Sequence, residues 1–459
     1  MNIGLVILAV YIAVLLGIAL YASKKDKKNI KDFATGGGLG IFILTLTFSA
    51  TYHSAYAFMG AGGFAYKNGI GWWCNGLWTV LPGVLFWVWG RRFWYLGKRY
   101  GYLSVSDYAS DVYQSKTVGI LVTLITMVFT IPYVAITDAA QGVFMFAGLL
   151  GGSLWVILAN FPSVADAYQA AFSHTPELFT MPGPNGVVTA QDWVSRWIVI
   201  TFGMMMFPQV TLRFFAGKNL NVMKWSAVFS SIYLTMIYVF TPCVGMIGRL
   251  LMPDIAAPDT IFPELLLKYT PAVFAALIIS GALAAAMSTG DSQLHATSTM
   301  VATDIYKKFV DKKANENTLY NVAKIGVLII GLASVVFALT RPTALADLLV
   351  LSNGGVAVLV PAVIGGLYWK KASRGGAIAS IVIGEICMVS MTFIFKVSPF
   401  GFSGALCSML ISLIIFVSVS FITKPQAHTS EVISSINNYF AEDKAVEETQ
   451  NNQGALAID

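Results

Sequence analysis

The chain has 459 residues, of which 56% are hydrophobic and only 11% charged, and its mean hydropathy is +0.70. A soluble globular protein carries about 25% charged residues, so this chain has too few charges to cover a water-facing surface. The composition excludes a soluble enzyme, a nucleic-acid-binding protein and a secreted disulfide scaffold. The net charge of +6 is informative only once the charges are placed along the chain. The four cysteines lie inside apolar segments, without metal-ligand or disulfide spacing.

Apolar windows of about 20 residues recur from end to end, which predicts an all-α protein that crosses the membrane many times. They lie at 3–22, 41–62, 70–90, 117–151, 193–212, 225–250, 272–298, 320–340, 345–369, 375–395 and 401–423. We expect one transmembrane domain over residues 1–425. Residues 426–459 are polar and acidic-leaning, and we expect them to form a cytoplasmic tail that is disordered at its end.

The basic residues predict the orientation of the spans. Alternate loops and the tail hold 23 of the 29 lysines and arginines, and such loops face the cytoplasm. This split predicts an outside N-terminus and a cytoplasmic C-terminus. The window 117–151 is long for one helix, but the charge pattern on both sides requires an odd number of crossings. We count it as one crossing, kinked or broken near Pro132, which gives eleven spans.

The second window is rich in small and hydroxylated residues. Residues 49–56 read Ser-Ala-Thr-Tyr-His-Ser-Ala-Tyr, and three glycines follow at 60, 62 and 63. Small residues let two membrane helices approach closely, which is one interpretation. The other is an unwound helix whose free carbonyls face a cavity and coordinate a cation.

The seventh window carries a second polar group, residues 281–293. Ser288 and Thr289 can offer hydroxyl oxygens one turn after the carbonyl of Ala285, and neutral oxygens suit a monovalent hard cation that must bind and leave. The alternative is that both hydroxyls bond back to their own helix. The triplet Gly290-Asp291-Ser292 superficially resembles a hydrolase serine motif, but no Ser-His-Asp constellation accompanies it. We expect no enzyme.

Together these motifs resemble the sodium:solute symporter family, closest to its pantothenate and monocarboxylate branch. The resemblance covers nearly the whole chain up to about residue 425 and rests on a combination of motifs. These are residues 36–40, 50–54 before the glycine cluster, 137–142, 208–213, 285–292 and 303–307.

The resemblance implies a LeuT-type core of ten helices in two inverted five-helix repeats. The ion and the solute would bind at the midplane beside two discontinuous helices. Carried over by position, the family's sodium site falls on the carbonyls of Ala50, His53 and Ala285 and on the hydroxyls of Ser288 and Thr289.

A second sodium position, used by some members of that family, would fall on Asp138, Asp291 and Ser292.

The family geometry also gives candidates for the solute site. They lie after the break in the second window and near the fifth: Thr51, Ser54, Tyr56 and Gln209. Hydroxyl groups beside a bound cation would suit a small carboxylate.

The chain departs from the family at one point. Family members have two further half-to-full spans, roughly 45–50 residues, where Ile136 here directly precedes Thr137. Loss of an even number of crossings leaves the downstream topology unchanged.

The leading hypothesis is a sodium-coupled symporter that imports a small organic solute, such as pantothenate or a monocarboxylate, through a bacterial-type plasma membrane. Na⁺ is the expected coupling ion; the expected partners are the solute and membrane lipid, with no nucleic acid or obligate protein partner. One alternative is a sensor or scaffold that keeps the fold without transporting. Another is proton coupling through His53 or Glu385.

Overall fold

The computed structural model describes residues 10, 13, 38–52, 56–73, 80–130, 140–339 and 345–455. Within these ranges the regular structure is helical, apart from one isolated bridge between Leu39 and Gly217. The predicted all-α class is confirmed.

The first half of the described chain contains short helices and breaks. Its elements are α3 (Ile41–Tyr52), η1 (Tyr56–Gly60), α4 (Ala61–Asn68), η2 (Gly69–Trp73), α6 (Leu81–Val88), α7 (Gly90–Tyr100), α8 (Val105–Val112), α9 (Lys116–Thr130), α10 (Ala140–Asn160), α11 (Val164–His174) and η4 (Pro176–Phe179). Prolines explain several starts: Pro82 and Pro176 occupy the first helical positions, where the missing N–H costs nothing.

The second half contains the longest helices. They are α12 (Ala190–Met204), α13 (Pro208–Ala216), α14 (Leu220–Leu251), η5 (Pro258–Thr260), α15 (Ile261–Tyr269), α16 (Ala272–Met300), η6 (Val301–Val310), α17 (Glu316–Leu339), α18 (Leu345–Ala357), α19 (Val360–Tyr368), α20 (Arg374–Val389), η7 (Ser390–Ile394), η8 (Pro399–Gly401), α21 (Gly404–Ile422) and α22 (Ala427–Ala455). Asn219 and Ser373 cap α14 and α20 through their side-chain oxygens.

Four helices of the described residues are long and apolar enough to cross a membrane, or up to seven spans if each bent pair counts as one. The bent pairs are α10 with α11, α12 with α13, and α18 with α19. Several predicted windows run partly outside the described ranges. The total of eleven spans and the orientation of the termini therefore stay predictions.

The second window changes from α-helix to π-helix within the described residues, and the unwinding predicted there stays a prediction. It divides into α3, the π-helical turn η1 and α4, and residues 53–55 between them lie outside the described ranges. The window 117–151 contains two helices, α9 and α10, and Pro132 between them also lies outside those ranges. α9 packs on α8 and α18, whereas α10 packs on α3, α14 and α16.

The tail differs from the expectation of disorder at its end, since α22 extends from Ala427 to Ala455. Its first turns bury Val432, Ile433 and Ile436 against the bundle, and this apolar face gives the helix a tertiary partner. The polar composition of residues 426–459 predicts disorder at their end because it offers few apolar side chains for burial; residues 456–459 lie outside the described ranges.

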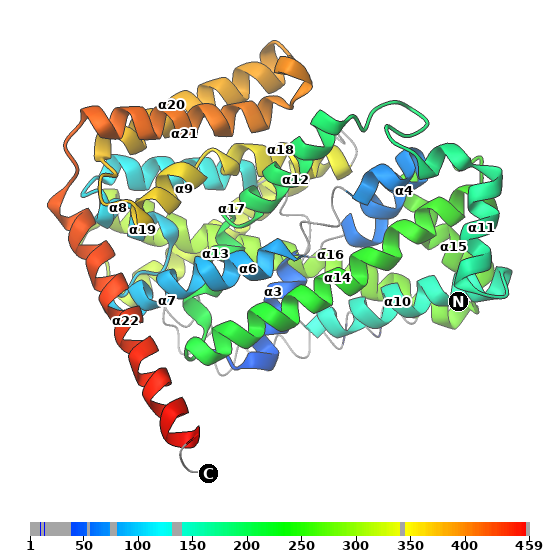
Figure 1. The fold of residues 1–459 in the computed structure, drawn as a ribbon, viewed down its shortest axis with the longest axis horizontal. Coiled ribbons are helices and arrows are strands. Elements are labelled where there is room, and N and C mark those ends of the chain that lie inside the picture. The colour runs from blue at the N-terminus through cyan, green and yellow to red at the C-terminus, as the bar shows by residue number, and fades with distance from the viewer. Residues whose placement is uncertain are drawn as a thin grey trace.

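Figure 1 shows the helices as an elongated bundle. The hairpin of α20 and α21 lies along one edge, and α22 descends beside α7 and α8. We call the end of the bundle that carries α7, α8, η6 and the start of α22 the basic end; its loops are those predicted to be cytoplasmic. The opposite end carries α4, α11 and α15.

Close backbone contacts fix the helices around the centre. A Cβ atom on Gly203 of α12 would lie 2.4 Å from the carbonyl oxygen of Asn353 in α18. On Gly245 of α14 it would lie 2.3 Å from the carbonyl oxygen of Gly62 in α4. Only glycine permits these two approaches, which place α18 and α14 directly against the two broken spans.

Candidate functional site

The end of α3 meets the break between α12 and α13. Tyr52, the last residue of α3, donates its hydroxyl hydrogen to the Sδ atom of Met205, which directly follows α12, at 3.1 Å. Towards the basic end, the N–H of Leu39 bonds to the carbonyl of Ala216 at 2.8 Å, and the N–H of Lys218 bonds to the carbonyl of Leu39 at 3.1 Å. The start of α3 is thus held to the end of α13, and the end of α3 to the α12–α13 break.

The break between α12 and α13 exposes a helix start inside the bundle. α12 and α13 meet at a bend of 51°, and Phe207 between them has extended backbone angles. Pro208 begins α13, and Gln209 follows it. Gln209 is 1% exposed, and neither its Nε2 nor its Oε1 atom has a hydrogen-bond partner among the described residues.

Unpaired buried polar groups gather on the helices around the breaks. Gln293 on α16 is fully buried, and both of its amide atoms lack a partner within the described chain. The hydroxyls of Thr201 on α12, Thr297 on α16 and Ser352 on α18 are also buried and without a hydrogen-bond partner in the described chain. A buried amide or hydroxyl without a partner costs about 1–3 kcal/mol, so such a concentration marks a place where a ligand or water supplies the missing bonds.

Gln293 and Thr297 are not among the residues selected from the sequence. They follow Thr289 at intervals of four residues, about one helical turn each. Residues 289, 293 and 297 therefore share one face of α16. The sequence did contain a signal for Gln293, namely an amide side chain in an apolar window, four residues after Thr289.

The residues of the predicted sodium site are placed only in part. Ala50 lies in α3, and Ala285, Ser288 and Thr289 lie in α16. α3 packs against α16, so the two helices that carry these residues are neighbours. His53 and the side chains of residues 281–292 lie outside what the structure describes. The coordination of the ion stays a prediction.

The predicted second sodium position is not placed: Asp138 and the side chains of Asp291 and Ser292 lie outside the described part of the chain.

Among the predicted solute-site residues, Gln209 is buried and unpaired, as above. Thr51 is also buried, but its hydroxyl donates to the carbonyl of Thr47 at 2.6 Å, which ties it to its own helix. Ser54 and the side chain of Tyr56 lie outside the described residues.

The space between Gln209 and the basic end is nearly closed. A cavity of about 10 Å³, room for one water molecule, lies where α8, α9, α13, α16 and α19 converge. Pro208 and Thr211 line it on one side, and Ser104, Thr299 and Met300 on another. Ser104, which lines this cavity, also belongs to a polar network between α8 and η6.

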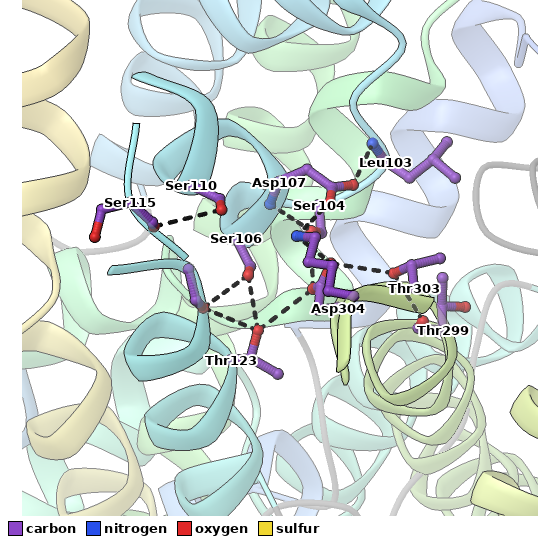
Figure 2. Close-up of polar contacts among 12 residues, drawn as sticks. Leu103, Ser104, Ser106, Asp107, Ser110, Ser115, Thr123, Thr299, Thr303 and Asp304 are labelled. Carbon is purple, nitrogen blue, oxygen red and sulfur yellow. Dashed lines mark hydrogen bonds and ion pairs between the residues drawn. The ribbon is translucent and has the colours of Figure 1, made fainter. Parts of the chain in front are cut away.

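In this network, side chains of α8, α9 and η6 bond to Asp304 (Figure 2). The Lys308 ammonium lies 2.9 Å from Oδ1 of Asp107 and 3.2 Å from Oδ1 of Asp304. Asp304 also accepts hydrogen bonds from Ser104 at 3.1 Å and Thr303 at 3.2 Å. The network joins α8 to the π-helix η6, which continues α16.

The two carboxylates share one lysine, and their protonation differs. Asp304 is 1% exposed, and burial, reinforced by the charge of Asp107, raises the pKa of Asp304 to about 7. Burial disfavours the charged form of Asp107 as well, but Lys308 outweighs it and lowers the pKa of Asp107 below its usual value. Asp107 is therefore the charged partner of Lys308, and Asp304 exchanges its proton near neutral pH.

Two other titratable residues lie outside the network. Glu385 on α20, the alternative residue for proton coupling, has a buried Oε1 atom without a hydrogen-bond partner in the described chain. His428 lies in α22, and its Nε2 atom is 2.8 Å from Oδ2 of Asp111.

Comparison with known proteins agrees with this arrangement. A solved Na⁺-coupled sialic acid symporter has the same fold, with a TM-score of 0.79 over 93% of this chain and 98% of that chain, at 17% identity. The chain is 27% identical to the sodium/pantothenate symporter of Haemophilus influenzae, over 84% of this chain and 89% of that protein. It is 24% identical to the sodium/proline symporter of Escherichia coli, over 84% and 87%.

The fold that the chain shares with the solved sialic acid symporter is of the LeuT type. The sequence model of the sodium:solute symporter family matches residues 33–151 and 131–384, and the chain belongs to this family. It is a sodium-coupled importer of a small solute and a multi-pass protein of the plasma membrane, and not an enzyme.

The comparisons agree with a missing internal segment. The family's two matches overlap at residues 131–151, around the junction of Ile136 and Thr137. The alignment with the Haemophilus protein extends over 443 residues, whereas 84% of this 459-residue chain is only about 386 residues. The relative is thus several tens of residues longer within the aligned region.

Exchange of Asp304 for asparagine tests the division of charge in the network. The native state holds a proton on Asp304 that the unfolded chain releases near pH 4, so native stability falls as pH rises from about 4 to about 7. Between pH 5 and pH 8 we expect a loss on the order of 2 kcal/mol in the native protein. Asp304→Asn should flatten this dependence in thermal unfolding of detergent-solubilised protein.

The matched control is Asp107→Asn, which removes the charged partner of Lys308. We expect this variant to lose about 1–3 kcal/mol at pH 7, more than Asp304→Asn. Equal losses for both variants, with unchanged pH dependence, would show that the assignment is wrong.

Proposed function

We propose that the imported solute is a small organic carboxylate, held beside the break between α12 and α13. The observation that carries the proposal is the buried, unpaired amide of Gln209 in the first turn of α13. The Nε2 group can donate to a carboxylate oxygen, and the start of α13 adds the positive end of a helix dipole. Pantothenate and proline, the solutes named for the two relatives, both carry a carboxylate.

Gln293 and Ser352 extend the proposed site. α16 packs on α13, and α18 packs on η1 and α12, so both residues come from helices around the same breaks. Their unpaired groups offer two donors and two acceptors to the polar part of a solute beyond its carboxylate. The two relatives differ in their solutes. We expect the side chains at positions 293 and 352 to determine which solute is bound.

The proposed sodium ligands are the carbonyls of Ala50, His53 and Ala285 and the hydroxyls of Ser288 and Thr289. Their support is the packing of α3 on α16 and the π-helical turn η1 in the same window. A cation bound there strengthens binding of the carboxylate, and the carboxylate strengthens binding of the cation by the same factor.

Movement of one Na⁺ across 100 mV supplies about 2.3 kcal/mol. This corresponds to nearly fifty-fold accumulation of the solute at about 1.4 kcal/mol for each factor of ten.

The network around Lys308 forms the inner barrier of the proposed transport cycle. Release of solute towards the basic end requires α8 to separate from η6, which breaks the contacts of Lys308 with Asp107 and those of Ser104 with Asp304. The cavity beside Ser104 holds no more than one water molecule in the present state. Alternating access then consists of opening this network while the break on the opposite side closes.

A second function is a sensor that binds the solute without transporting it. The observation in its favour is the overlap of the two family matches at residues 131–151, around the junction of Ile136 and Thr137. Such a protein would keep the binding site at the breaks and lose the coupled movement.

Uptake by purified protein in proteoliposomes separates the two functions. With an inward Na⁺ gradient we expect accumulation of labelled pantothenate, proline or lactate at least ten-fold above vesicles with K⁺ in place of Na⁺. The same vesicles with only a pH gradient test proton coupling. Na⁺-dependent binding without accumulation would support the sensor, and uptake driven by protons alone would contradict sodium coupling.

The double variant Ser288→Ala/Thr289→Ala removes two proposed sodium ligands. We expect the Na⁺ concentration for half-maximal uptake to rise at least ten-fold, while the melting temperature changes little. Ser298→Ala is the control because its hydroxyl, on the same helix, bonds back to the carbonyl of His295. Unchanged sodium dependence in the double variant would reject this site.

Gln209→Leu tests the carboxylate site. Removal of a buried, unpaired amide should leave thermal stability unchanged or raise it by about 1 kcal/mol, while the affinity for the solute falls at least ten-fold. Gln169→Leu on the surface of α11 is the control. Wild-type affinity in Gln209→Leu, measured by solute-dependent tryptophan fluorescence, would contradict the proposal.

A further inference from the structure

A cavity of about 330 Å³ lies at the basic end, between α7, the start of α14 and the C-terminal helix α22. Arg91, Asn221 and Lys224 supply its polar groups, and Trp87 and Phe440 supply apolar walls. We propose that this cavity binds the phosphate headgroup of an anionic phospholipid from the inner leaflet. The site is separate from the breaks and does not depend on the proposed solute.

Arg91 is the centre of the cavity's charge. Its guanidinium carbon lies 5.2 Å from the centre of the Trp87 ring and 4.9 Å from that of Phe440. The two rings hold the guanidinium in place, and the buried Nε atom has no hydrogen-bond partner among the described residues. A guanidinium offers paired N–H donors in one plane, the arrangement that fits two phosphate oxygens.

Lys224 and Asn221 face the same cavity from one side of α14, three residues apart. Both are exposed, so neither needs to be released from another contact in the protein interior before it meets a phosphate. One ammonium and one amide beside the guanidinium give the headgroup donors from two helices. A headgroup bound here would therefore join α7 to α14.

The surface on either side of the cavity indicates that the phosphate belongs to a lipid. On α14, Trp225, Val228 and Ile232 follow Lys224 along one face and are 43%, 42% and 52% exposed. On α6, Val80 and Val84 precede Trp87 at helical spacing and are also exposed. Exposed apolar faces of membrane helices contact acyl chains. Both faces end at the cavity, where a headgroup would lie.

The charged side chains around the cavity favour a headgroup with a single negative charge. Arg91 and Lys224 bring two positive charges, and Asp443 of α22 brings one negative charge to the rim. A ligand with a single negative charge, such as the phosphodiester of phosphatidylglycerol, balances this set. Basic pockets at the cytoplasmic boundary of membrane helices are suited to anionic lipids, and the loops at this end carry most of the chain's lysines and arginines.

The proposed site also includes the tail. Phe440 and Asp443 reach the cavity because α22 is held against α7 and α8 (Figure 1). Tyr439 stacks on Tyr95 with ring centres 4.5 Å apart, and His428 bonds to Asp111. A bound lipid therefore stabilises the docked position of α22.

The test uses the full chain, stripped of lipid in a maltoside detergent. We expect phosphatidylglycerol to raise the melting temperature by at least 3 °C and to remain bound in native mass spectrometry, whereas phosphatidylcholine does neither. Arg91→Gln/Lys224→Gln should abolish both effects. The control, Lys98→Gln/Lys116→Gln, removes the same charge from exposed positions at the basic end.

Several outcomes would overturn the proposal. One is loss of the shift in the control variant, which would mean attraction to the basic surface in general. Another is an equal shift with inorganic phosphate alone, which would mean a free anion. Asp443→Asn should tighten phosphatidylglycerol binding at least three-fold. Weaker binding in that variant, with a preference for phosphatidylethanolamine, would contradict the anionic headgroup. Arg91→Lys keeps the charge and should retain part of the lipid bound by folded protein.

Discussion

The contact between the two broken spans is the constraint on which the rest of the structure depends. Tyr52 joins the end of α3 to Met205 after α12, and Leu39 joins the start of α3 to Ala216 at the end of α13. Inside a membrane an unpaired backbone group is costly, so two helices can be interrupted only where each covers the other or a ligand does. This pairing creates a polar centre in a chain that is otherwise apolar.

Polar groups without partners and polar groups with many partners are separated along α16 and η6. Gln293 and Thr297 are buried and unpaired near the breaks, whereas Asp304 and Lys308, two to three turns further on, belong to a connected network. The first group is suited to exchange partners with a solute and an ion. The second is suited to hold two elements together until the solute is released. One continuous helical segment thus connects the binding region to the inner barrier.

The sequence predicted the all-α class and the family, because these depend on composition, apolar length and local motifs. Gln209 was selected as a solute-site residue; the structure buries it directly after the α12–α13 break, and its role stays a prediction. Gln293 was missed because its significance depends on lacking a partner, which no local pattern reveals. The helix α22 was not predicted, because this polar segment is held in place through contacts with α7 and α8, far away in the sequence. The sodium ligands stay predictions.

The direction of α22 has a practical consequence for labelling the protein. Its middle is held by Tyr439 and Phe440 against Tyr95 of α7, and its C-terminal part extends away from the bundle (Figure 1). A fluorescent reporter fused after this helix would stand clear of the membrane domain. Truncation ahead of Tyr439 would instead uncover the aromatic surface around Tyr95, so tagged and shortened versions of the chain are not interchangeable in expression trials.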